Sequence, residues 1–141
     1  MLAVTRYDEV YVQLTAAKVE EQLAAWAALA NAVKGNPAAE TVLAAFAPGY
    51  FAGALLALDH HFMHRMRGAE GKDGNPLNEV RMLCDAIMEN DGVLAENKTI
   101  KYRADKAIAG LEIGQKIVLD AETFERLAKA YIEEIGKRFP A

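Results

Sequence analysis

Residues 22–58 read QLAAWAALANAVKGNPAAETVLAAFAPGYFAGALLAL, a span of 37 residues with only two charged side chains, Lys34 and Glu40. The chain holds 27 alanines, and 16 of them lie between positions 16 and 57. Gly35-Asn36-Pro37 interrupts the span, because glycine suits the left-handed position that ends a helix and proline can begin the next one. So short a link predicts two antiparallel helices joined as a hairpin.

The first of these helices is expected at residues 5–34. Thr5 and Asp8 at its start resemble a capping box in which Asp replaces the usual Glu. Apolar residues then recur at spacings of seven, which is typical of a long helix with one apolar seam. These residues are Val12, Val19, Trp26 and Val33.

The second helix is expected at residues 38–67, with a kink where Pro48 removes a backbone donor. At about 100° per residue it has two different faces. A bulky stripe is expected to meet the core, and it consists of Phe51, Leu55, Leu58, Phe62 and Met66. The other face forms a predicted groove for a ligand or partner, with small residues leading to two histidines: Gly49, Gly53, Ala57, His60 and His64.

The second helix has a large apolar surface, which a membrane, the rest of the chain or a second copy could cover. Residues 41–58 carry no charge over 18 positions, the length at which a membrane span becomes a candidate. The many alanines and glycines, with Pro48-Gly49 inside, favour the buried helix of a bundle, so we expect no membrane association. Its small residues allow close packing by another helix, either of this chain or of a second copy. Because one short bundle cannot easily hide so much apolar surface, we expect a homo-oligomer.

The remainder of the chain predicts two more helices and a small β element. Asn75-Pro76 should begin a helix that ends near residue 90, and Asp120 should begin a last helix that ends near residue 139. Residues 99–102 and 116–119 are short and β-prone, and predict an antiparallel hairpin. The expected fold is therefore mainly α, a single four-helix bundle-like domain over residues 1–141 with a kinked central helix. A small antiparallel β-hairpin would be inserted before the C-terminal helix.

The overall charge excludes a basic nucleic-acid footprint. The chain has 16 Lys and Arg against 20 Asp and Glu, for a net charge of −4, and we expect no nucleic-acid partner. Cys84 is the single cysteine, so no internal disulfide can form, and the first residues do not read as a signal peptide. A cytoplasmic protein is expected.

All three histidines lie in residues 60–64, and two of them have a spacing that suits a metal ion. His60 and His64 share a helix face, where they could bind a divalent metal such as zinc. One or two further ligands would come from another segment, and the sequence does not choose among the candidates Glu79, Asp85, Glu89, Glu20 and Glu21. Without a Glu between the histidines, the pattern is weaker than that of metalloproteases. The alternative interpretation is that these histidines end a helix and face solvent or carboxylates.

The loop at residues 68–75 joins the helix of the histidines to the helix of Glu79. Glycines, a lysine and a helix N-terminus can hold an anion, but Asp73 occupies the Ser/Thr position of a P-loop, so the nucleotide motif fails. If a pocket exists, its predicted rim is formed by Lys72, Asp73 and Arg81.

Two functions of different classes follow from these patterns. The preferred one is a non-enzymatic binding or assembly module, a homo-oligomer whose groove takes a helix or a small molecule. The alternative is a metal-dependent hydrolase in which His60 and His64 bind the ion and Glu79 is a ligand or base. Lys72 or Arg81 would then hold an anionic substrate. The sequence identifies no catalytic residue.

Overall fold

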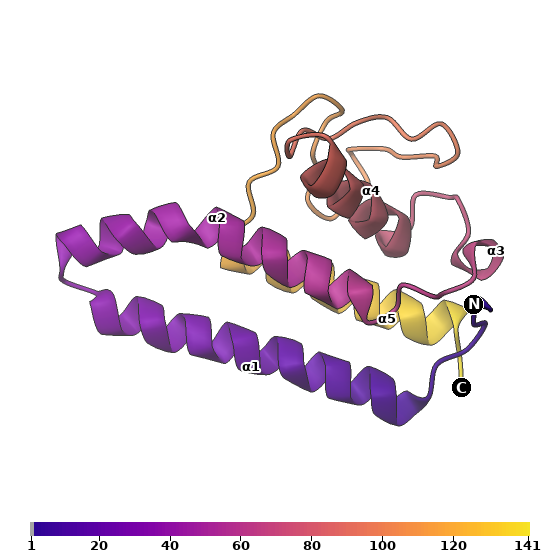
Figure 1. The fold of residues 1–141 in the computed structure, drawn as a ribbon, viewed down its shortest axis with the longest axis horizontal. Coiled ribbons are helices and arrows are strands. Elements are labelled where there is room, and N and C mark those ends of the chain that lie inside the picture. The colour runs from indigo at the N-terminus through magenta and orange to yellow at the C-terminus, as the bar shows by residue number, and fades with distance from the viewer. Residues whose placement is uncertain (1) are drawn as a thin grey trace.

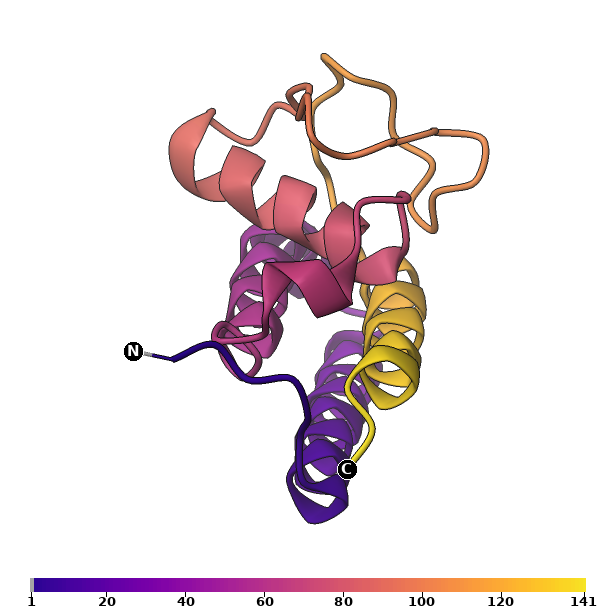
Figure 2. The same ribbon diagram turned by 90° about the vertical axis from the view of Figure 1, so that its right-hand side faces the viewer.

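The computed structural model describes residues 2–141, which form five helices and no sheet. A long antiparallel hairpin is formed by α1 (Glu9–Val33) and α2 (Pro37–His60), and the single turn of α3 (Arg67–Glu70) follows it. In Figures 1 and 2, α5 (Ala121–Arg138) lies along α1 and α2, and α4 (Pro76–Glu89) packs on α2 and α5, away from α1. The prediction of a mainly helical chain is confirmed.

Each of the four long helices begins at a side chain that accepts a hydrogen bond from a backbone N–H group. Asn36, Asn75 and Asp120 cap α2, α4 and α5, at the positions where the sequence predicts helix starts. At α1 the predicted capping box is wrong. Asp8 itself is the N-cap and accepts from the Val10 backbone N–H at 3.1 Å, so the helix begins four residues later than expected.

The second helix is shorter than predicted. It ends at His60 rather than near residue 67, and the next residues form turns. Arg65 then pairs with the N-terminal segment, because the backbone N–H of Val4 donates to His64 and that of Met66 donates to Val4. The helix runs through Pro48 without a break, and Figure 1 shows its axis bending near the middle, as the proline predicts.

The predicted β-hairpin at residues 99–102 and 116–119 is wrong. The second segment pairs instead with residues 92–94, through one isolated bridge between Val93 and Lys116. The first segment bonds to the loop after α3, where the backbone N–H of Lys101 donates to Lys72 at 2.9 Å. Both segments alternate between buried and exposed residues because they lie on the helical core, and this burial produces the same pattern as a strand.

The hydrophobic core occupies only one end of the hairpin. Val19 of α1 and Phe51 of α2 are buried there, together with most of the inner faces of α4 and α5. Between Val19 and Phe51, from residue 20 to residue 50, no side chain is buried. The hairpin tip, which we define as residues 20–50, therefore extends beyond the core, as Figure 1 shows.

Candidate interaction face of the hairpin

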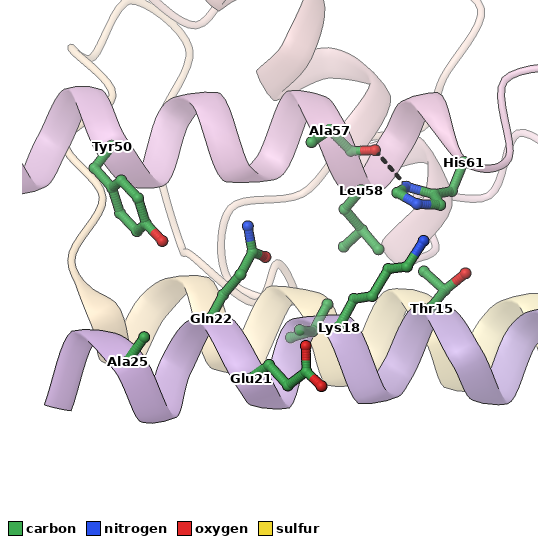
Figure 3. Close-up of a pocket in the computed structure, with 10 residues that line it drawn as sticks. Thr15, Lys18, Glu21, Gln22, Ala25, Tyr50, Ala57, Leu58 and His61 are labelled. Atoms are coloured by element: carbon green, nitrogen blue, oxygen red, sulfur yellow. Dashed lines mark hydrogen bonds between the residues drawn. The ribbon is translucent and has the colours of Figure 1, made fainter. Parts of the chain in front are cut away.

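A groove of about 400 Å³ lies between α1 and α2 next to the core. Figure 3 shows Lys18 and Gln22 extending from α1 toward α2, and Tyr50 extending back toward α1. Its volume falls in the range of small-molecule sites, although it is open along one side. The groove is lined by Thr15, Lys18, Val19, Glu21, Gln22, Ala25, Tyr50, Ala57, Leu58 and His61.

His61 closes the end of this groove near the core. Its Nδ1 lies 2.7 Å from the Ala57 carbonyl oxygen, and the Tyr11 hydroxyl donates to the His61 carbonyl oxygen at 2.6 Å. A carbonyl oxygen can only accept, so Nδ1 donates its proton in this hydrogen bond. The first bond orients the ring, and the second ties the His61 backbone to α1.

A second groove of about 500 Å³ lies at the hairpin tip and is almost entirely apolar. On ideal helices its residues Leu29 and Ala39 fall within about 20° of Lys18 and Ala57 of the first groove, so both grooves open on one side of the hairpin. We call this side the open face. The second groove is lined by Leu29, Val33, Asn36, Ala38, Ala39, Val42, Leu43 and Phe46.

Four of the five predicted groove residues lie on α2 along the open face, and His64 lies in the turn after the helix. All five, Gly49, Gly53, Ala57, His60 and His64, are exposed. A Cβ atom added to Gly49 or to Gly53 would meet no other atom within 4 Å. Only Ala57 of the five lines a groove, and no helix of the described chain covers the small residues.

The sequence analysis placed only Ala57, of the residues that line the first groove, in a binding surface. On α1, Thr15, Lys18 and Gln22 are polar residues at helical spacing beside the apolar seam, and this pattern could have identified the α1 side of the groove. His61 lies one helical turn after Ala57, and this spacing could have assigned it to the groove.

The strongest polar cluster is a buried network at the other end of the molecule. The Arg65 side chain, fully buried, donates to Glu70 and to Asp59 at 2.9 Å each, and to the Tyr131 hydroxyl at 3.0 Å. Burial alone would raise the pKa of Glu70, but the hydrogen bond from Arg81 and the charges of Arg65 and Arg81 lower it below its ordinary value. The network joins the end of α2 to α3, α4 and α5.

This network divides the residues of the predicted pocket rim. Arg81 donates to both carboxylate oxygens of Glu70, from Nε at 3.1 Å and from Nη2 at 2.6 Å. Asp73 instead pairs with Arg138 at 2.9 Å, and Lys72 is exposed. Arg81 and Asp73 are thus held in ion pairs with different partners, and the Lys72 side chain is exposed.

The Glu79 side chain binds the backbone of the loop that contains Ile108 and Ala109. Its carboxylate is buried and accepts from the backbone N–H groups of Ile108 at 2.7 Å and Ala109 at 2.9 Å. Burial raises its pKa, although the two backbone hydrogen bonds act in the opposite direction. His60 and His64 are exposed, and within residues 2–141 no three His, Cys, Asp or Glu side chains are grouped to hold a metal ion. The predicted set of His60, His64 and Glu79 is not brought together.

The described residues thus present one extended surface without a partner, the open face, beside a polar network that is satisfied mainly by its own members. Comparison of the chain with family models, with curated proteins and with solved structures gives no match in any of the three.

Proposed function

We propose that the protein is a homodimeric assembly module in which the open face of the α1–α2 hairpin binds a second copy of the chain. The observation that carries this proposal is the hairpin tip, 31 consecutive residues with no buried side chain and only four charges. Val42 is 70% exposed and Phe46 is 56% exposed. Contiguous exposed apolar surface of this kind is rare on a monomer and marks interaction sites.

The open face has the dimensions of a stable interface. Helices of 25 and 24 residues are about 36 Å long, and two of them side by side are about 20 Å wide, which gives roughly 700 Å². A typical specific interface buries about 800 Å² on each partner. One face of the hairpin therefore supplies nearly the whole area that a dimer needs.

A second copy fits this face better than a lipid bilayer does. Among the described residues, α2 is the one helix long and apolar enough to cross a membrane, with 22% of its most apolar window buried. However, Gly35 and Asn36 tie α2 closely to α1, whose exposed surface carries charges such as Glu20 and Glu21. Carrying those carboxylates into hydrocarbon would cost about 2.5 kcal/mol or more each. A partner with polar groups of its own avoids that cost.

Light scattering on the full chain at tens of micromolar tests the proposal. The wild type should be a dimer, and Val42→Glu should convert it to a monomer. Val118→Glu is the matched control, since Val118 is 63% exposed but lies outside the hairpin, and it should leave the dimer intact. A monomeric wild type would contradict the proposal, as would flotation of the protein with phosphatidylcholine vesicles. The cytoplasmic location stays a prediction.

A further inference from the structure

The charges on α1 and the small residues on α2 are arranged about a common level of the hairpin. We infer that the second copy docks with each helix antiparallel to its counterpart, about a two-fold axis at Gly53 of α2 and between Val19 and Glu20 of α1. Lys18 of each copy then pairs with the partner's Glu21. This arrangement rests on the proposed homodimer and specifies its geometry.

The first observation is the strip of α1 on the open face. Its residues alternate at spacings of four and three, the pattern by which one helix packs along another. The strip consists of Leu14, Lys18, Glu21, Ala25 and Ala28. Lys18 and Glu21 are both exposed, and no ion pair among residues 2–141 includes either of them. They are the only charged residues of the strip.

Antiparallel pairing matches these two charges. An axis midway between Lys18 and Glu21 brings each lysine opposite the partner's Glu21, twice in one dimer. The same axis brings Leu14 opposite the partner's Ala25, so that a large side chain meets a small one. A shift by one helical turn would place like charges or alanines opposite the ions.

The second observation is the strip of α2 on the open face. Gly49 and Ala57 lie four residues before and four residues after Gly53. With the axis at Gly53, this glycine faces its own counterpart and Gly49 faces the partner's Ala57. Small residues at all three positions let two helix backbones approach closely. The open space beside Gly49 and Gly53 leaves room for that approach.

The third observation is that the two centres lie close together in the folded hairpin. The Tyr11 hydroxyl donates to His61, and Trp26 contacts Phe51, Tyr50 and Phe46 with ring centroids 4.8, 5.3 and 6.5 Å away. The middle of α1 between Tyr11 and Trp26 therefore lies beside the segment of α2 from about residue 53 to residue 56. The axis chosen from the α1 charges and the axis chosen from the α2 small residues agree to within about one helical turn, or about 5 Å.

The other two-fold arrangement fits poorly. An axis parallel to the helices would lay α1 of one copy over α2 of the other. Lys18 and Glu21 would then face the uncharged strip around the partner's Gly53. The two ions would then have only each other as partners, one turn apart on the same helix, and would gain none across the interface. The antiparallel arrangement satisfies both ions and is the one we choose.

Charge reversal tests this register without disturbing the fold, because both residues are exposed. The K18E chain has two acids at these positions and the E21K chain has two bases, so each should self-associate about tenfold or more weakly than wild type. A 1:1 mixture should form a heterodimer as tight as the wild-type dimer. Contacts within one chain stay repulsive in both variants, so this recovery can arise only between chains. Sedimentation of each variant and of the mixture provides the measurement.

A disulfide at the axis gives an independent test. In a Cys84→Ala background, Gly53→Cys should cross-link to its counterpart under mild oxidation. Gly136→Cys on α5 is the matched control, because a Cβ there also meets no atom within 4 Å, and it should not cross-link faster than random collision allows. A wild-type dimer whose single charge variants still dimerise, or whose mixed variants stay apart, would overturn the register while leaving the homodimer intact. A monomeric wild type would remove the homodimer itself.

Discussion

Replacing Glu70 by Gln should be among the most damaging isosteric changes in the molecule. The fully buried carboxylate accepts two hydrogen bonds on each oxygen, from Arg65 and Arg81 on Oε1 and from Asn78 and Arg81 on Oε2. Whichever oxygen becomes an amide nitrogen, two bonds are lost and a donor faces two donors. The substitution also leaves the buried Arg65 with Asp59 as its one remaining anionic partner.

The expected loss of stability is about 3 to 5 kcal/mol, the usual cost of removing one member of a buried ion pair. For 141 residues the total free energy of unfolding is roughly 7 to 20 kcal/mol, so a large share disappears. The melting temperature should fall by about 10 to 15 °C. Urea unfolding followed by far-ultraviolet circular dichroism measures the difference, with both proteins at the same concentration because the proposed dimer would stabilise the folded chain.

The dependence on pH provides a second measurement of the same prediction. The pKa of Glu70 is lower in the folded chain than in the unfolded chain. Its ionised form therefore stabilises the fold above its ordinary pKa, and this contribution is lost as the pH falls through the folded value. The difference in the free energy of unfolding between wild type and E70Q should have its full size at pH 7 and shrink below about pH 4.

Glu133→Gln is the matched control for this prediction. Glu133 is also a helical glutamate in an ion pair, but its side chain is 70% exposed and lies 3.4 Å from Lys137. Exposed pairs of this kind contribute little, so the change should cost less than about 0.5 kcal/mol. An E70Q protein within about 1 kcal/mol of wild type, or a gap that persists unchanged at pH 3, would refute the reasoning.

Three further predictions concern other buried groups. Glu79→Ala removes the acceptor of the Ile108 and Ala109 backbone N–H groups, so amide exchange in residues 100–119 should accelerate about tenfold or more while α5 stays protected; unchanged exchange would contradict this role. The buried Tyr7 hydroxyl has no hydrogen-bond partner among the described residues, so Tyr7→Phe should leave the free energy of unfolding unchanged or slightly higher, and a loss above about 1 kcal/mol in urea unfolding would contradict it. Burial raises the pKa of the Cys84 thiol, so an aromatic disulfide reagent should label the native protein far more slowly than the urea-unfolded chain, and equal rates would be the contrary result.

The sequence predicted the helical hairpin and three of the four long-helix starts because those features are local. Gly35-Asn36-Pro37, Asn75-Pro76 and Asp120 act on the residues next to them, and their chemistry can be recognised without the rest of the chain. The end of α2 was missed because it depends on Arg65 and on the N-terminal segment, 61 residues away in the sequence, that pairs with it.

The candidate site could be predicted only in part. The small residues around Gly53 were placed on one helix face by their spacing and are exposed, and their role as a binding surface stays a prediction. The pairing of Arg65 with Tyr131 joins residues 66 positions apart, and no periodicity connects them. Glu79 was expected to be a metal ligand. The sequence alone does not show its actual partners, the backbone N–H groups of a loop that is distant along the chain.

The position of Trp26, the single tryptophan, determines what fluorescence can report about this protein. Its ring stacks on Tyr50 and Phe46 and packs edge-to-face with Phe51, at the level of the hairpin where buried residues give way to exposed ones. Its emission therefore follows the hairpin tip, and the second copy proposed to cover it, more than it follows the packing of α4 and α5. In an unfolding experiment the emission should change before the helical signal is lost, and in the proposed dimer this change should depend on protein concentration. A midpoint taken from fluorescence alone would then describe dissociation and fraying of the tip as much as unfolding of the domain.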